Sequence, residues 1–298
     1  MEVRQSDEIL PDQFFPEGAR WYGNRLWFGD IHAARVVSFG DNYLPRIEAQ
    51  FRSNCSGIGF LDDGTPIASL MRERILARIE ADGTYGVHAD LSDTGCDHIN
   101  DIVTDGKGRT YVDCLSYGMH WFEPERHSSG TLIHRIKNLA GETPDSVTDQ
   151  IALVERDGTH RIVADNLLGP NGLAITGDGR YLIVAEWRAN RLTRFRIDEK
   201  GSLVERAVFA HTEGIPDGIC VDEEGAVWVA SPTTNDCVRY RMGGEVLERV
   251  KGVGRRITSC VLGGADRRTL FLTTDEHPEI GKGRIEIARV TVPGAGYP

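Results

Sequence analysis

A hairpin pattern that recurs along the chain constrains the fold more than any other feature of the sequence. In its two clearest copies, at 169–186 and 215–230, a polar residue and a glycine open a short apolar strand. A turn containing Asp and Gly follows, and a second strand rich in apolar residues ends the unit. In both copies the turn glycine comes eight positions after the leading polar residue, Asn171 or Asp217. Such a turn between two apolar runs is typical of a β-hairpin.

The pattern can be followed through six copies, the last of them degraded. The polar residues that open the copies, here called the leading residues, are Glu17, Ser56, Asn100, Asn171, Asp217 and Thr258. Successive leading residues are 39, 44, 71, 46 and 41 positions apart. A period near 40–45 residues with several short strands per unit is typical of a propeller blade.

A further strand can be read after most of the hairpins, which brings each repeat to about four strands. These strands are expected at 72–78, 191–197, 238–242 and 284–290. Strands that follow one another without intervening helices exclude a βαβ fold. The sequence therefore predicts an all-β protein, a six-bladed β-propeller with about four antiparallel strands per blade, built as a single domain over residues 1–298.

The interval of 71 residues indicates that the third repeat carries a loop insertion around 117–148. Aromatic residues, including Tyr117 and Trp121, occur in it together with Gly, Ser and Pro. Long loops in compact folds are usually functional lids or linkers, and the aromatic content favours a lid.

Charge and cysteine usage narrow the possible partners and the compartment. The formal net charge is −11, whereas nucleic acids and anionic membranes need a basic protein surface, so we expect neither as a partner. None of the six cysteines has Cys-x-x-Cys spacing, which favours buried free thiols over a thiolate metal site. The start of the sequence lacks a signal-peptide pattern, and no apolar run is long enough to span a membrane. We therefore expect a cytoplasmic protein that is a monomer or small homo-oligomer.

A ring of blades brings its equivalent positions to one depth around the central channel, so the leading residues should meet in space. Two of them, Glu17 and Asp217, are carboxylates, and two, Asn100 and Asn171, are amides. Two like charges in a small volume repel, and a hard cation relieves that repulsion. Oxygen ligands suit Ca²⁺, Mg²⁺ or Mn²⁺ better than Zn²⁺. The alternative is that these residues only cap strands and form turns.

Five short motifs carry a resemblance over nearly the whole chain: Phe15-Pro16-Glu17-Gly18, Asn100-Asp101, Pro170-Asn171-Gly172-Leu173, Pro216-Asp217-Gly218 and Thr258-Ser259-Cys260. Together they resemble the SMP-30/gluconolactonase/luciferin-regenerating-enzyme (regucalcin-like) family. This resemblance implies a propeller with one divalent metal in its channel, most simply Ca²⁺, with Mg²⁺, Mn²⁺ or Zn²⁺ as alternatives. It places the metal ligands at Glu17, Asn171 and Asp217.

The resemblance also implies substrate contacts. Asn100 matches a position that contacts substrate or reaches the metal through water, and Glu125 resembles a substrate-contacting glutamate. Sugar-lactone members of the family usually have an arginine two residues before that asparagine, whereas this chain has His98. A forked cation is thus replaced by a group with a pKa near ~6.5, which makes a polyhydroxylated sugar lactone less secure as the substrate.

The favoured function is a metal-dependent lactonase that hydrolyses a lactone or cyclic ester to the hydroxy acid. The resemblance implies that Asp217 is both ligand and general base, and His98 is either a second acid/base or only a hydrogen-bonding residue. Trp187, Tyr117 and Trp121 either line an apolar substrate pocket or pack within the fold. No Gly-x-Ser-x-Gly motif occurs, so an acyl-enzyme is not expected. The alternatives are a non-catalytic calcium- or ligand-binding propeller and a paraoxonase-like aryl-ester or phosphotriester hydrolase.

Overall fold

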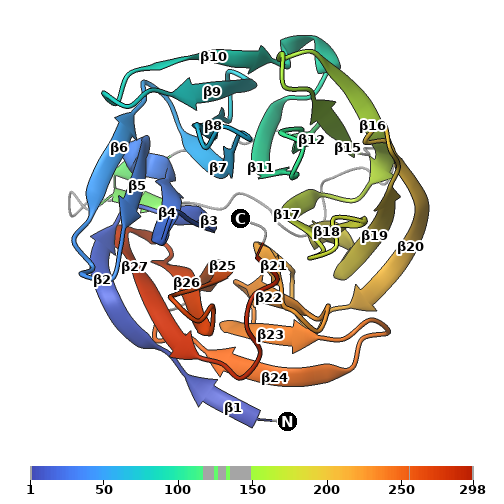
Figure 1. The fold of residues 1–298 in the computed structure, drawn as a ribbon. Helices are drawn as coiled ribbons and strands as arrows, with labels where there is room; N and C mark the ends of the chain where they lie inside the picture. The colour runs from blue at the N-terminus through green and yellow to red at the C-terminus, as the bar shows by residue number, and fades with distance from the viewer. Residues whose placement is uncertain (1, 117–123, 127–131, 135–148, 255, 297–298) are drawn as a thin grey trace.

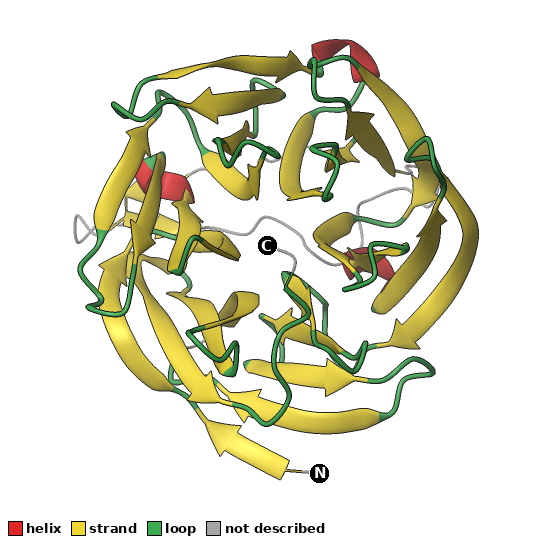
Figure 2. Cartoon of the chain, viewed as in Figure 1, coloured by secondary structure: helices red, strands yellow, loops and turns green. Residues whose placement is uncertain are grey.

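The computed structural model describes residues 2–116, 124–126, 132–134, 149–254 and 256–296 of the chain. It consists of six sheets arranged in a ring around a common axis, which is a six-bladed β-propeller (Figure 1). The region along this axis that the innermost strands line is here called the channel. In the described part of the chain the helical segments are short turns between strands (Figure 2): η1 (Ile31–Ala33), η2 (Ser92–Thr94) and η4 (Trp187–Ala189). The predicted fold class is confirmed.

Each blade runs from an innermost strand at the channel to an outer strand at the rim. Blade one comprises β3 (Pro16–Tyr22), β4 (Arg25–Asp30), β5 (Arg35–Phe39) and β6 (Arg46–Gln50). Blade two comprises β7 (Cys55–Phe60), β8 (Pro66–Leu70), β9 (Ile75–Ile79) and β10 (Tyr85–Asp90). Blade three comprises β11 (His98–Thr104), β12 (Thr110–Leu115), β15 (Asp149–Val154) and β16 (His160–Leu167).

The second half of the ring repeats this order. Blade four comprises β17 (Pro170–Ile175), β18 (Tyr181–Glu186), β19 (Arg191–Ile197) and β20 (Leu203–His211). Blade five comprises β21 (Ile219–Val221), β22 (Val227–Ser231), β23 (Asp236–Tyr240) and β24 (Val246–Lys251). Blade six comprises β25 (Arg256–Gly263), β26 (Thr269–Glu276) and β27 (Glu279–Arg289), with its outer strand taken from the start of the chain.

The N-terminal residues close the ring. Strand β2 (Asp7–Gln13) pairs antiparallel with β27, with Asp7 opposite Ile287, and thereby completes blade six. Strand β1 (Glu2–Gln5) pairs in parallel with β24 and adds a fifth strand to blade five (Figure 1). The hairpin pattern did not predict either strand, because they lie before its first copy.

The hydrophobic core is divided among the interfaces between blades. A cluster containing Ile183 and Val229 joins blades four and five, and one containing Phe28 and Phe271 joins blades one and six. Comparable clusters join the other neighbouring blades. The inner strands are covered by other blades on both faces, and β7 is buried along its whole length. This explains why these strands read as apolar runs bounded by turn residues rather than as strict polar–apolar alternation.

The insertion in blade three reaches the opposite side of the ring. Its hairpin of β13 (Pro124–Arg126) and β14 (Leu132–His134) pairs with blade six, with Ile133 opposite Glu279 of β27. Other parts of the predicted 117–148 loop, including Tyr117 and Trp121, lie outside the described residues.

The six cysteines are free thiols, as predicted, and all but Cys220 are buried. Within the described part of the chain, no helix is long and apolar enough to cross a membrane.

Candidate functional site

The leading residues lie at the start of the innermost strands, where they surround one mouth of the channel. Glu17 is in β3, Asn100 in β11 and Asn171 in β17, and Asp217 comes two residues before β21. Asn100 Nδ2 donates to Asn171 Oδ1 over 3.2 Å, and the Asn171 side chain lies close enough to Asp217 to lower the pKa of its carboxyl group. Three side chains from three different blades therefore lie together at this mouth.

The two carboxylates of this group are close enough to repel each other. Burial raises the pKa of Glu17 well above its usual range, and the charges of Asp217 and Asp101 raise it further. Burial also raises the pKa of Asp217 well above normal, although the charge of Arg256 opposes the rise. Asp217 Oδ1 is buried and finds no hydrogen-bond partner among the described residues. Repelling carboxylates and an unpaired carboxylate oxygen are features that a bound cation would resolve.

Oxygen donors from Glu17, Asn171 and Asp217 fit a hard divalent cation in type and in charge. The set has only two carboxylates, and within the described ranges no group of three or more His, Cys, Asp or Glu side chains is placed to hold a metal ion. Asn171 and Asp217 are partly exposed, so the mouth of the channel gives access to them.

Close backbone contact between neighbouring inner strands explains the glycine that follows most leading residues. A Cβ atom at Gly172 would lie 2.8 Å from Ile219 N, and one at Gly57 would lie 2.6 Å from Ile102 N. A Cβ atom at Gly218 would lie 2.6 Å from the Cα atom of Ser259. The glycines therefore let the inner strands approach, and this approach brings the leading side chains into one small volume.

Buried acids behind the channel hold the segments that lead into the inner strands. In blade one, Asp30 Oδ1 accepts hydrogen bonds from the backbone N–H groups of Phe14 and Phe15 at 2.8 and 2.9 Å. The other Asp30 oxygen accepts from Arg35 at 3.0 and 2.7 Å. The segment so anchored continues into Pro16 and Glu17, so Asp30 supports a proposed metal ligand from behind.

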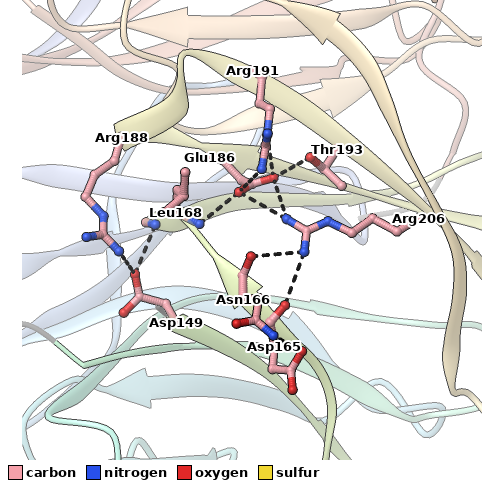
Figure 3. Close-up of polar contacts among 10 residues, drawn as sticks. Asp149, Asp165, Asn166, Leu168, Glu186, Arg188, Arg191, Thr193 and Arg206 are labelled. Atoms are coloured by element: carbon pink, nitrogen blue, oxygen red, sulfur yellow. Dashed lines mark hydrogen bonds and ion pairs between the residues drawn. The ribbon is translucent and has the colours of Figure 1, made fainter. Parts of the chain in front are cut away.

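Blade four repeats this arrangement around Glu186 (Figure 3). Glu186 accepts from Leu168 N at 2.8 Å and from Arg191 at 2.9 and 2.8 Å. Thr193 also donates to it, and Arg206 makes a longer ion pair at 3.4 Å. Burial disfavours the charged form of Glu186, but the hydrogen bonds from Arg191 and Thr193 outweigh it and lower its pKa. The anchored segment leads to Pro170 and Asn171.

A second acid steadies the same segment from the neighbouring blade. Asp149 of β15 accepts a hydrogen bond from Gly169 N at 3.0 Å and pairs with Arg188 at 2.7 Å (Figure 3). In blade three, Asp113 plays a comparable part, since it accepts a hydrogen bond from Asn100 N at 2.6 Å. Burial raises the pKa of Asp113 well above normal, and the charge of Asp101 adds to the rise.

His98 lies at the start of β11 and is buried. Burial lowers its pKa to about 3, with a smaller contribution from the charge of Arg72. The Arg72 turn is held against this strand by a 3.1 Å hydrogen bond from Ile99 N to Met71 O. A histidine with so low a pKa is neutral near neutral pH: its ring keeps one N–H that can donate a hydrogen bond, but it supplies no imidazolium acid and is only a weak base. The environment therefore favours hydrogen bonding over acid/base chemistry.

Of the remaining predicted substrate residues, Trp187 lies near the leading residues, whereas Glu125 lies on a hairpin that is joined to blade six. Trp187 begins η4 and is partly exposed, and its ring lies over Gly169, where a Cβ atom would be 2.6 Å from the indole Cδ1. It therefore lies beside the segment that leads to Asn171. Glu125 lies on β13, in the hairpin joined to blade six.

Sequence reasoning missed the supporting acids, although a signal for two of them is present. An acid followed five positions later by an arginine occurs in blades one and four, as Asp30 with Arg35 and Glu186 with Arg191. Both pairs have the same role. The sequence shows Asp101 as part of a motif but carries no signal for its buried partner Arg20.

The ring of sheets and the oxygen-lined mouth define a class of protein: six-bladed propellers with a candidate cation site at one end of the channel. Residues 15–276 match the family model described as the SMP-30/Gluconolactonase/LRE-like region. The chain therefore belongs to this family, as its motifs indicated.

Individual relatives extend the comparison. Pentonolactonase XacC of Haloferax volcanii is 26% identical over 87% of this chain and 80% of its own length. A 6-deoxy-6-sulfogluconolactonase of Pseudomonas putida is 25% identical over 92% of this chain and 89% of its own. The solved structure of a luciferin-regenerating enzyme superposes with a TM-score of 0.78 at 18% identity and covers 97% of this chain and 96% of that one. This last similarity supports the fold alone.

Proposed function

We propose that the protein is a metal-dependent lactonase that hydrolyses a lactone or related cyclic ester to the hydroxy acid. The observation that carries the proposal is the grouping of Asn100, Asn171 and Asp217 from three blades beside the repelling carboxylate of Glu17. Family membership and two relatives named as lactonases support the reaction class.

Glu17, Asn171 and Asp217 would hold the cation, with Ca²⁺ as the first ion to test and Mg²⁺, Mn²⁺ and Zn²⁺ as alternatives. A divalent cation supplies Lewis acidity toward the ester carbonyl and toward water. Asp217 is the general base, because its Oδ1 has no described partner and can accept a proton from the attacking water. The water oxygen forms the new bond to the acyl carbon, the ring C–O bond breaks, and the departing oxygen takes up the proton that Asp217 accepted, which gives the hydroxy acid.

The other proposed residues bind and orient the substrate. Asn100 lies next to Asn171, and Asp113 fixes its backbone, so its amide is positioned for a substrate oxygen. His98 is neutral and can offer only a hydrogen bond, while Trp187 presents a partly exposed apolar surface beside Gly169. Contacts from Glu125, Tyr117 and Trp121, the cytoplasmic location and the oligomeric state stay predictions.

The test is hydrolysis of a lactone panel by chelated protein, followed in a pH-stat as each of the four cations is added back. Asp217→Asn should lower the rate by at least about a hundredfold, because it removes the base and one ligand charge. Asp82→Asn is the matched control, since Asp82 is exposed on a turn and bonds only its neighbour Thr84 among the described contacts. Full activity after complete metal removal would refute the metal-dependent mechanism.

The same panel separates the rival functions. Cation binding without hydrolysis of any lactone, thiolactone or aryl ester would indicate a non-catalytic binding propeller. Hydrolysis confined to aryl esters or phosphotriesters would indicate a paraoxonase-like enzyme.

A further inference from the structure

A buried ion pair lies in the channel wall next to the proposed metal ligands. Arg20 of β3 pairs with Asp101 of β11 over 2.9 Å, and the two side chains are 4% and 2% exposed. Arg20 also donates to the backbone oxygens of Ala19 and Ile102. Asp101 accepts from Ile102 N at 2.8 Å and from Leu173 N at 3.1 Å. The pair therefore connects blades one, three and four.

Both members of this pair depart from the pattern of the repeat. At the position after the leading residue, four repeats have a glycine: Gly18, Gly57, Gly172 and Gly218. Blade three has Asp101 there instead. At the third position after the leading residue, blade one has Arg20, whereas the other repeats have small or apolar residues: Gly59, Val103, Ala174, Cys220 and Val261. The channel thus contains one additional anion and one additional cation that the repeat itself does not require.

Stability does not account for this pair. A buried ion pair is often no more stabilising than well-packed apolar residues of similar size, because desolvation offsets the attraction. The pairing of Arg20 is also incomplete, since its Nε is buried and finds no partner among the described residues. The charges themselves do reach the site: Asp101 raises and Arg20 lowers the pKa of Glu17, and Asp101 also acts on Asp217.

With their side chains ionised, the four charged residues inside the channel have a net charge of −2. Glu17, Asp101 and Asp217 supply three negative charges when ionised, and Arg20 supplies one positive charge, which leaves −2. Asp113 is not counted, because it lies on β12, the second strand of its blade, and hydrogen-bonds the backbone N–H of Asn100 at 2.6 Å.

At the mouth, Asp275 is paired by both nitrogens of the Arg256 fork, one at 2.6 Å, so these two charges cancel. One divalent cation would therefore neutralise the channel.

On the basis of the proposed function, we infer that the Arg20–Asp101 pair sets the charge of the metal site, so that the site matches a divalent cation. Arg20 has a second effect, because it holds the Asp101 carboxylate away from the cation and leaves the ligands to the leading residues. Removing Arg20 would leave a charge of −3 and a released carboxylate, both of which favour tighter binding of cations and a shift toward trivalent ions.

The test is isothermal titration calorimetry of chelated protein with CaCl₂ and, separately, with TbCl₃. Arg20→Met should tighten Ca²⁺ binding about tenfold or more and Tb³⁺ binding by a larger factor. Asp101→Asn should weaken Ca²⁺ binding about tenfold, because it leaves a net charge of −1. The double variant restores −2 and should bind Ca²⁺ within about threefold of the wild-type protein.

Arg239→Met is the matched control, because Arg239 makes an equally buried pair with Asp222, at 2.6 Å, near the far end of an inner strand. It should leave both affinities unchanged. Circular dichroism and thermal melting establish that each variant is folded. If Arg20→Met does not fold, the Ca²⁺ affinities of Asp101→Asn and of the double variant test the inference.

Three results would overturn the inference. Unchanged or weaker Ca²⁺ binding in folded Arg20→Met would refute it, as would unchanged binding in Asp101→Asn. If the wild-type protein binds neither ion, the proposed function fails and the inference fails with it. If the wild-type protein binds Ca²⁺ and the variants do not differ from it, only the inference fails.

Discussion

Replacing Glu186 by glutamine tests whether the buried acids hold the blades as described. The Glu186 side chain is fully buried and accepts two hydrogen bonds from Arg191, one from Leu168 N and one from Thr193. Hydrogen bonds to charged groups contribute about 1.5–3 kcal/mol each, so the two from Arg191 give roughly 3–6 kcal/mol. Arg191 and Arg206 are 24% and 34% exposed and regain some hydration. We therefore expect Glu186→Gln to lower the free energy of unfolding by about 2–4 kcal/mol.

Urea unfolding followed by tryptophan fluorescence measures this loss as a shift of the midpoint at constant slope. Glu205→Gln is the matched control in the same blade, because the Glu205–Arg196 pair has its side chains 63% and 36% exposed. It should cost less than about 1 kcal/mol. A loss below 1 kcal/mol for Glu186→Gln would refute the argument.

The pH dependence of the same variant has a definite sign. The pKa of Glu186 in the folded state is lowered from 4.5, so its contribution is fully present above 4.5 and is lost as the pH falls through the folded-state value. The difference between wild type and Glu186→Gln should therefore narrow below that pH. A difference that widened there would contradict the assignment.

Two further predictions concern the mouth of the channel. Gly172→Ala should destabilise the fold and weaken cation binding, since its Cβ would lie 2.8 Å from Ile219 N; Gly86→Ala, with nothing within 4 Å, should leave both unchanged. Thermal melts with and without Ca²⁺ compare the two, and equal behaviour would count against close strand contact as the reason for the glycines. His98 should show no titration between pH 5 and 9 in NMR, because its pKa is lowered to about 3; a midpoint near ~6.5 would show that it is solvated.

The repeat predicted the fold because its signal has a direct steric cause. Glycine follows four of the six leading residues, and at Gly57 and Gly172 a Cβ atom would collide with the neighbouring inner strand, so the pattern marks the channel. The strand expected at 191–197 is β19 itself, whereas the one expected at 284–290 begins earlier, at Glu279. That earlier start also provides the pairing position for β14.

Two features of the site could not be predicted from local sequence. The charge state of His98 depends on burial, and a sequence provides only the pKa of a solvated histidine. The Arg20–Asp101 contact joins residues 81 positions apart, and nothing in either blade alone indicates the partner. By contrast, the contact between Asn100 and Asn171 was within reach, because both occupy the same position of the repeat.

The closure of blade six has a consequence for synthesis of the chain. Asp7 cannot pair with Ile287 until that residue, 280 positions later, has been synthesised. At about 5–20 residues per second, a ribosome takes roughly 14–56 s to cover that distance. During that time the apolar faces of blade one that will meet blade six, including Phe28 and Phe39, lack their cover. Newly made chains therefore expose apolar surface at this seam until the last blade has been synthesised.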